Sequence, residues 1–287
     1  MTEQLYLEDS TVQSFEATVE RSLADRVVLD ATHFYPTGGG QPHDTGTLAV
    51  DGEQRRVTGV EKKDEVYHTL AGDTPDRGTT VQCEIDWDRR HAHMRYHTAQ
   101  HLLSAVLLRE FDAPTVGNQL YDDRARLDCE YDRFTETDLA DLETELNALV
   151  DDGLDVRHYT MSRERAESEL DTQRTRIDLL PDSIRELRIV EIGDAEDPFD
   201  RTACAGTHVG NTADLGEVTV TDRTTQGAEK ERVTFELAEP VTDGGREHGT
   251  RERDRRERSE RGSVGDTAAD ERRVSASRPD DTREVDG

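Results

Sequence analysis

The 287-residue chain carries 65 acidic and 36 basic side chains, a formal net charge of −29, and only 32% of its residues are hydrophobic. This length holds one large domain or two modest ones with a lean core. No apolar run reaches the roughly 20 residues of a membrane span, and the start "MTEQLYLEDS" lacks the regions of a secretory signal. We therefore expect a cytoplasmic protein with no membrane partner.

Residues 1–88 form the first predicted domain, which is rich in β-strand patterns. Short runs broken by Asp, Gly and Pro predict a small barrel or a sandwich. These runs are "EATVERS", "RVVLD", "TGTLAV", "RRVTGVEK", "EVYHTL" and "TTVQCEID". A glycine-rich loop, "FYPTGGGQPHDTG" at residues 34–46, interrupts them.

Residues 89–241 form the second predicted domain, and a helical pattern opens it from about Arg89 to Glu110. One stripe of this helix should face the core because its members recur at helical spacing. The stripe consists of Met94, His97, His101, Ala105 and Leu108.

A second helix is predicted within residues 135–153. Thr135 and Asp138 are predicted to form an N-cap pair, and Gly153 to end the helix. Its buried face consists of Leu139, Leu142, Leu146 and Leu149.

The remainder of the second domain alternates between strands and a short helix. We expect a strand at 154–160, a helix at 162–170 that Ser162 caps, a strand at 186–193 and a β-hairpin at 217–237. Residues 194–216 are expected to be irregular. The tail, residues 242–287, has almost no large apolar side chain, so we predict a solvated, disordered segment, with RNA contact through its arginines as the lesser alternative.

Arginine far outnumbers lysine among the basic residues, since only Lys62, Lys63 and Lys230 are lysines. This composition resembles the proteins of salt-loving archaea, and an acidic interaction protein is the alternative. In molar salt the Debye length is about 3 Å, so the negative charge is weak evidence against a nucleic-acid partner. The three cysteines, Cys83, Cys129 and Cys204, form no disulfide framework and indicate a reducing compartment.

Two residue pairs have the spacing of metal ligands. His97 and His101 lie four apart on the predicted helix, and Cys204 and His208 lie four apart in a segment of small residues. Each pair alone also fits ordinary core or surface residues, and His93 competes with His101 as the partner of His97. Together they form a donor set suited to zinc. Because distant segments supply them, a catalytic site is favoured over a compact zinc finger.

The loop "TGGGQ" consists of Thr37, Gly38, Gly39, Gly40 and Gln41. Its glycines let the backbone approach a ligand closely or turn sharply, and a plain hairpin turn remains the alternative. No Gly-Lys-Ser/Thr follows, so the loop is not a phosphate-binding Walker loop, nor is it a dinucleotide fingerprint. Thr37 and Gln41 are the polar groups that such a loop would present.

Four ordered segments closely resemble the alanyl-tRNA editing proteins, the AlaX family, which are free-standing relatives of the editing domain of alanyl-tRNA synthetase. The segments are "FYPTGGGQPHDTG", "MRYHTAQHLL", "VGNQLYDDRARLDCEY" and "CAGTHV". The resemblance implies an α+β fold, in which an N-terminal barrel-like β domain packs on an editing core of the threonyl/alanyl-tRNA synthetase second-additional-domain type. The glycine motif is similar to that of the medium-length class.

The resemblance also implies the site. One Zn²⁺ per chain would be held by His97, His101, Cys204 and His208. The substrate would be mischarged alanine tRNA, with serine and in this class also glycine removed from it without ATP. The threonine before the glycines, Thr37, would recognise the serine hydroxyl. Gln119 matches a glutamine of the family pattern, although "GNQLYDD" departs from that pattern around it.

We therefore predict catalytic roles for Thr37, Gln41, Gln119 and Cys204, and substrate contacts from residues 37–41. No DNA partner is expected, and a monomer is favoured. Four protein ligands fill a tetrahedral zinc shell, whereas catalytic zinc usually keeps one position open. The alternatives are accordingly a non-catalytic, zinc-stabilised RNA-binding module or a hydrolase for another small ester or amide.

Overall fold

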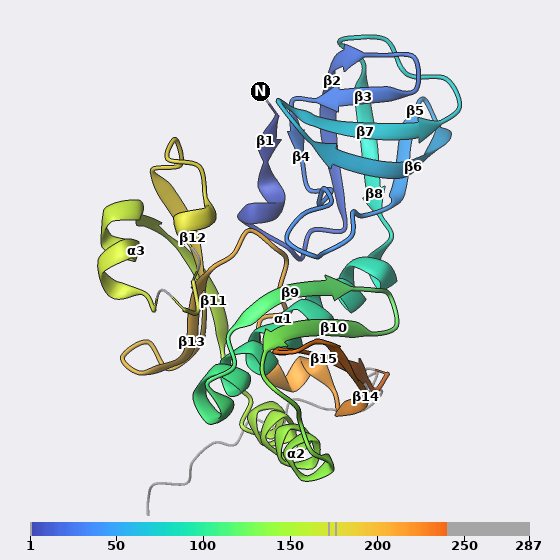
Figure 1. Cartoon of the computed structure of the whole chain (residues 1–287). Helices are drawn as coiled ribbons and strands as arrows, with labels where there is room; N and C mark the ends of the chain where they lie inside the picture. Colours follow the sequence, from blue (N-terminus) through green and yellow to red (C-terminus); the bar gives the residue numbers. More distant parts are fainter. Residues whose placement is uncertain (1, 172, 176, 240–287) are drawn as a thin grey trace, which may run out of the picture. The chain divides into compact units, whose positions relative to one another are not determined.

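Six antiparallel strands close into a barrel in the first part of the chain (Figure 1). The computed structural model describes residues 2–171, 173–175 and 177–239. The barrel order is β2-β3-β7-β6-β5-β8. The strands are β2 (Ser14–Ser22), β3 (Arg26–Leu29), β5 (Gly46–Val50), β6 (Glu53–Lys62), β7 (Val66–Ala71) and β8 (Thr80–Ile85). Of the two predicted forms, barrel and sandwich, the barrel is confirmed.

Alternating side chains fill the barrel interior. In β8, Val81, Cys83 and Ile85 are buried while the residues between them are exposed, as expected for strands with one face toward the core and one toward solvent. Burial raises the pKa of the Cys83 thiol to about 12, which makes it a packing residue rather than a nucleophile. Outside the barrel, β1 (Glu3–Gln4) pairs in parallel with β4 (Ala31–Thr32), and the short 3₁₀ helix η1 (Leu5–Leu7) follows β1.

The second part is built around α1 (Trp87–Phe111). A four-stranded antiparallel sheet in the order β14-β15-β10-β9 supplies one layer of its packing. The sheet consists of β9 (Thr115–Leu120), β10 (Ala125–Glu130), β14 (Val218–Gly227) and β15 (Lys230–Leu237). Helix α2 (Glu136–Asp151) also packs on α1.

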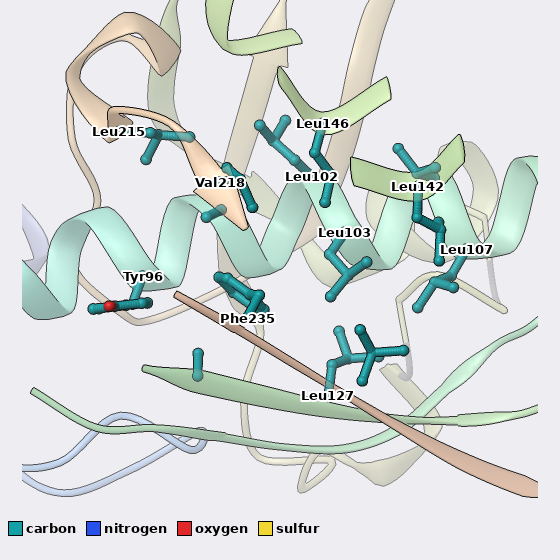
Figure 2. Close-up of a cluster of buried hydrophobic side chains, with 14 of the residues drawn as sticks. Tyr96, Leu102, Leu103, Leu107, Leu127, Leu142, Leu146, Leu215, Val218 and Phe235 are labelled. Carbon is teal, nitrogen blue, oxygen red and sulfur yellow. The ribbon is translucent and has the colours of Figure 1, made fainter. Parts of the chain in front are cut away.

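Figure 2 shows why α1 is buried on nearly all of its faces in its middle turns. Leu102 meets Leu146 of α2 on one side, and Leu103 points toward Phe235 and Leu127 of the sheet on the other. The predicted stripe is correspondingly buried, with Leu108 only partly so. Burying a leucine contributes about 1.5–3 kcal/mol, so this cluster fixes the helix that carries His97 and His101.

Helix α2 begins as predicted, because the Thr135 hydroxyl accepts from the Asp138 amide and the Asp138 carboxylate accepts from the Thr135 amide. This capping box satisfies two amides that have no partner within the helix. Gly153 adopts a positive φ of 61° immediately after the C-cap residue Asp152, which fits the predicted end.

A three-stranded antiparallel sheet, β11-β12-β13, completes the described fold. It consists of β11 (Val156–Ser162), β12 (Glu186–Gly193) and β13 (Pro198–Ala203), with α3 (Arg163–Glu169) following β11. The 3₁₀ helices η2 (Ile177–Leu179) and η3 (Thr212–Leu215) are short. The expectation of an irregular segment at 194–216 was wrong for β13, whose inward face is polar, with Asp200 and Thr202 buried.

The observed α+β fold with an N-terminal barrel confirms the predicted class. The proposed boundary between residues 88 and 89 stays a prediction, and the predicted disordered tail, 242–287, lies outside the described residues. Among the described helices, none combines the length and apolarity that crossing a bilayer requires.

Candidate metal centre

Four predicted ligands meet at one point. The donor atoms of His97, His101, Cys204 and His208 all lie within 4.8 Å of one another. The Cys204 Sγ lies 3.4 Å from the His208 Nε2 and 3.6 Å from the His97 Nε2. Three imidazoles and one thiol within this distance can hold a metal ion, and nitrogen and sulfur donors in this ratio suit zinc.

Two distant elements bring the pairs together. Helix α1 presents His97 and His101 one turn apart, and their ring centroids are 5.2 Å from each other. The turn after β13 supplies Cys204 and His208. Gly206 in this turn touches the His97 ring so closely that an added Cβ would lie 2.0 Å from its Cε1. A side chain at position 206 would therefore push His97 out of the cluster.

Each histidine is held through its Nδ1 by a second residue. The His97 Nδ1 lies 2.9 Å from the Gln41 Oε1, and the His101 Nδ1 lies 3.1 Å from the Asp200 carboxylate. The His208 Nδ1 lies 3.3 Å from the Thr98 Oγ1. Such outer partners fix the ring orientation and the tautomer of metal-binding histidines.

Toward the histidines, the Gln41 amide oxygen, the Thr98 hydroxyl and the Asp200 carboxylate can only accept a hydrogen bond. The amide oxygen of Gln41 also accepts from the Thr207 amide at 3.1 Å, and the Thr98 hydroxyl donates its proton to the Met94 carbonyl at 3.0 Å. A carboxylate such as Asp200 has no proton to give. His97 and His208 therefore carry the proton on Nδ1 and direct the Nε2 lone pair into the cluster. The His101 Nδ1 lies 3.1 Å from the Asp200 carboxylate, which accepts its proton, and 3.3 Å from an Arg174 nitrogen.

Asp200 stays ionised at every physiological pH. Burial opposes its charge, but the Arg174 guanidinium and His101 outweigh burial and bring its pKa down to about 2. Arg174 donates to both carboxylate oxygens, at 2.7 and 2.6 Å. This buried pair makes Asp200 a permanent acceptor for His101.

The protonation states of Cys204 and His208 favour metal binding. Burial would raise the pKa of the Cys204 thiol, yet the adjacent imidazoles of His97, His208 and His101 bring it well below its ordinary value. The Gly206 amide also donates to the sulfur at 3.3 Å. Burial lowers the pKa of His208 to about 3, so this imidazole is neutral. Burial also opposes a charge on His101, but its hydrogen bonds to Asp200 and Cys204 outweigh burial and raise its pKa. Metal ligands need a thiolate and neutral imidazoles, so a metal ion that binds here has to displace a proton from His101.

A cavity of about 510 Å³ opens beside the cluster. His97, His101 and Cys204 line one side of it, and Thr37 and Gly38 of the glycine-rich loop line another. No aspartate or glutamate is among the described residues that line this cavity, although the chain contains 65 of them. The cavity can therefore admit an anionic ligand despite the acidity of the chain.

The glycine loop is both a hairpin turn and a cavity wall, so the two predicted alternatives coexist. Gly38 and Gln41 exchange backbone hydrogen bonds of 3.1 and 2.9 Å, and Gly39 and Gly40 between them have φ of 59° and 83°. Positive φ at both central residues defines a type I′ turn and favours glycine. An added Cβ at Gly40 would lie 2.1 Å from the Asn118 side chain, so the turn packs directly on β9.

The remaining predicted residues occupy different places. Thr37 is exposed on the cavity wall. Gln41 is fully buried and faces His97 instead of being presented by the loop surface. Gln119 donates to the Gly40 carbonyl at 3.1 Å, so it fastens the turn to β9. The competing His93 lies apart from the cluster, 2.9 Å from the Asp122 carboxylate.

Sequence reasoning missed Asp200, Arg174 and Thr98. Asp200, Thr202 and Cys204 occupy every second position along β13 and the residue that follows it. Since alternate side chains of a strand share one face, a strand prediction here would have placed Asp200 and Thr202 on the same face as Cys204. Thr98 follows His97 directly and carries no separate signal. Arg174 belongs to a turn with no periodic pattern.

Comparison with known proteins identifies the family. The profile of tRNA synthetases class II (A) matches residues 5–89, and that of the threonyl and alanyl tRNA synthetase second additional domain matches residues 187–234. The alanyl-tRNA editing protein AlaX-M of Methanosarcina barkeri is 38% identical, and the match covers 83% of this chain and 100% of that protein. The chain belongs to the alanyl-tRNA editing protein family.

Two further relatives define the extent of this membership. AlaX-M of Methanosarcina acetivorans is 36% identical over 83% of this chain and 99% of that protein. The alanine–tRNA ligase of Thermococcus kodakarensis is 38% identical over 83% of this chain, which spans only 26% of the ligase. The two profile matches thus cover the barrel and the segment with Cys204 and His208.

Loss of the Asp200 charge should weaken metal binding without removing a ligand. We expect Asp200→Asn to lower zinc affinity about 10- to 100-fold, because a neutral amide holds the His101 tautomer less firmly. Competition with a coloured chelator measures this. Asp122→Asn is the matched control, because Asp122 contacts His93, which lies outside the cluster. This variant should leave zinc affinity unchanged. Equal affinity for the two variants would contradict the outer-partner role of Asp200.

Proposed function

We propose that this family member is a zinc-dependent hydrolase that removes serine, and also glycine, from mischarged alanine tRNA as a trans-acting enzyme of translational quality control. The observation that carries the proposal is the four-donor cluster in the wall of a cavity that no described aspartate or glutamate lines. The chemistry that a bound zinc supplies there is Lewis acidity toward an ester carbonyl or its attacking water. A pocket cannot strongly reject a substrate that merely adds a hydroxyl, which is why a separate hydrolytic site is useful.

The chain's own residues divide the work in this proposal. Gln41, Asp200 and Thr98 orient the three ligand imidazoles, so they act as positioning residues. Gln119 holds the glycine turn against β9. Thr37 is the polar side chain of the loop that reaches the cavity, and we assign it the contact with the serine hydroxyl.

Lys62 is the proposed contact for the tRNA phosphate backbone. It is exposed at the rim of the cavity, and its ammonium donates to the neutral amide oxygen of Gln4 at 2.7 Å. Because Gln4 is uncharged, this hydrogen bond does not neutralise the ammonium. Arg174, which also lines the cavity, is instead paired with Asp200.

Removal of the Lys62 charge should weaken tRNA binding. We expect Lys62→Ala to raise KM for charged tRNA about threefold to tenfold and to reduce the dependence of KM on salt, with kcat little changed. Lys63→Ala is the matched control, because the neighbouring Lys63 is already paired with Glu61 at 2.9 Å. Steady-state kinetics at two KCl concentrations measure both. A KM equal to that of the Lys63 variant would remove Lys62 from the binding site.

The proposal is tested by incubating the protein, purified in high KCl with zinc, with Ser-, Gly- and Ala-tRNA(Ala). Hydrolysis of the seryl and glycyl esters with the alanyl ester spared is expected. Failure to release serine would overturn the function.

A second candidate is a non-catalytic, zinc-stabilised RNA-binding module, which the four-donor set favours because it fills a tetrahedral shell. Chelation separates the two functions. A structural zinc would leave an unfolded chain when it is removed, whereas our proposal expects a folded, inactive protein whose activity returns with zinc.

A further inference from the structure

The hydroxyl of Thr37 on the cavity wall has a fixed partner behind it. Its Oγ1 lies 3.2 Å from the Nδ1 of His43, which follows the glycine turn. His43 is half-buried and is not among the described residues that line the cavity. The contact therefore lies on the side of Thr37 that a substrate would not occupy.

The second nitrogen of His43 determines the direction of this hydrogen bond. The His43 Nε2 lies 3.1 Å from the backbone carbonyl oxygen of Thr58 in β6. A carbonyl oxygen can only accept, so Nε2 carries the proton, and in the neutral imidazole Nδ1 then offers only a lone pair. The Thr37 hydroxyl must donate its single proton to His43.

A hydroxyl that has given away its proton can only accept from other groups. Thr37 thus presents lone pairs, and no donor, to the cavity. The His43 backbone is itself held, because the Arg89 guanidinium donates to its carbonyl oxygen from Nε at 3.4 Å and from a terminal nitrogen at 3.3 Å.

We propose that His43 is a positioning residue that makes Thr37 an obligate hydrogen-bond acceptor, and so favours the seryl ester, whose side-chain hydroxyl donates, over the alanyl ester; release of glycine does not use this contact. This inference rests on the proposed function. The methyl group of alanine cannot donate, so the correctly charged tRNA gains nothing from the contact. Without His43 the Thr37 hydroxyl would rotate freely between donating and accepting.

Two substitutions separate positioning from simple anchoring of the loop. In His43→Asn the amide oxygen can take the place of Nδ1 and accept from Thr37, while the bond to Thr58 is lost. In His43→Gln the longer amide can reach Thr58, while the acceptor for Thr37 is lost. At pH 8, where a histidine side chain in water is neutral, we expect kcat/KM for Ser-tRNA(Ala) to stay within about threefold in the Asn variant. It should fall about threefold to tenfold in the Gln variant, the value of one hydrogen bond.

The opposite order would mean that His43 only anchors the loop to β6, and equal rates in the two variants would also overturn the inference. A double-mutant cycle gives a second readout. In a Thr37→Val background, His43→Gln should cost no further activity, because its effect passes through the Thr37 hydroxyl. Independent, multiplying losses would contradict this.

The tautomer can be measured without activity. With ¹⁵N-labelled histidine, the His43 signal, identified by its loss in His43→Asn, should show a protonated Nε2 and a bare Nδ1; the reverse tautomer would overturn the inference. A wild-type protein inactive on Ser-tRNA(Ala) would refute the proposed function itself. An active wild type with independent effects at positions 37 and 43 would refute only the role of His43.

Discussion

Replacing Cys204 with serine should reduce deacylation of Ser-tRNA(Ala) by at least about 100-fold, since loss of an outer partner alone costs about 10- to 100-fold. The substitution removes the thiolate that lies within 3.6 Å of two ligand imidazoles. A hydroxyl in its place stays protonated and binds zinc poorly. Zinc content, measured by metal analysis after gel filtration, should fall from one per chain in parallel with the rate.

Cys83→Ala is the matched control for this experiment. Cys83 is buried in the barrel, with a pKa raised to about 12 by burial, and it has no part in the metal cluster. This variant should keep one zinc per chain and the wild-type rate. A Cys204→Ser protein that retains both zinc and activity would remove Cys204 from the site.

Replacing Arg90 with methionine should lower the free energy of unfolding by about 3–5 kcal/mol, because it strands a buried carboxylate without its partner. Arg90 and Asp44 are both fully buried, and the Arg90 Nε lies 3.0 and 2.9 Å from the two carboxylate oxygens. Arg90 also donates to the carbonyl oxygens of Ser10 and His33. The pair fastens the glycine-rich loop to α1. Urea unfolding at fixed KCl measures the loss as a lower midpoint.

Two variants distinguish this explanation from a general effect of losing an arginine. Arg89→Met removes the adjacent arginine, which pairs with the exposed Asp122 and donates to the His43 carbonyl oxygen, and should cost only about 1–2 kcal/mol because it leaves no buried charge unpaired. Arg90→Met combined with Asp44→Asn should recover part of the stability, because no unpaired buried charge remains. A single Arg90→Met variant as stable as Arg89→Met would contradict the account.

The four donor residues could be picked out from the sequence because their signals are local. His97 and His101 lie one helical turn apart on a strongly predicted helix, and Cys204 and His208 form a compact pair of donors in a turn. The contact between the two pairs is long-range in the sequence. It was inferred from the chemistry of the donors and from the family resemblance, because no local sequence pattern predicts it. The capping box of α2 was equally predictable, since it needs only Thr135 and Asp138.

The outer partners of the cluster were not predictable, because their contacts with the histidines carry no local sequence signal. Strand β13 was expected to be irregular because its buried face carries Asp200 and Thr202 instead of apolar residues, and hydrophobic alternation is the usual sign of a strand. Gln41 was predicted to act at the site, and that role stays a prediction; its contact with His97 spans 56 residues of sequence. Only the packing of the loop on α1 reveals that its amide faces a ligand.

The most direct test of the central claim is the rate at which the zinc-loaded wild-type protein releases serine from Ser-tRNA(Ala), compared with the chelated protein and with zinc restored. Circular dichroism recorded on the same samples shows whether each is folded. We predict rapid release with zinc, loss of release from a folded chelated protein, and recovery when zinc returns. Serine release that is indifferent to zinc, or absent in all three samples, would contradict this prediction.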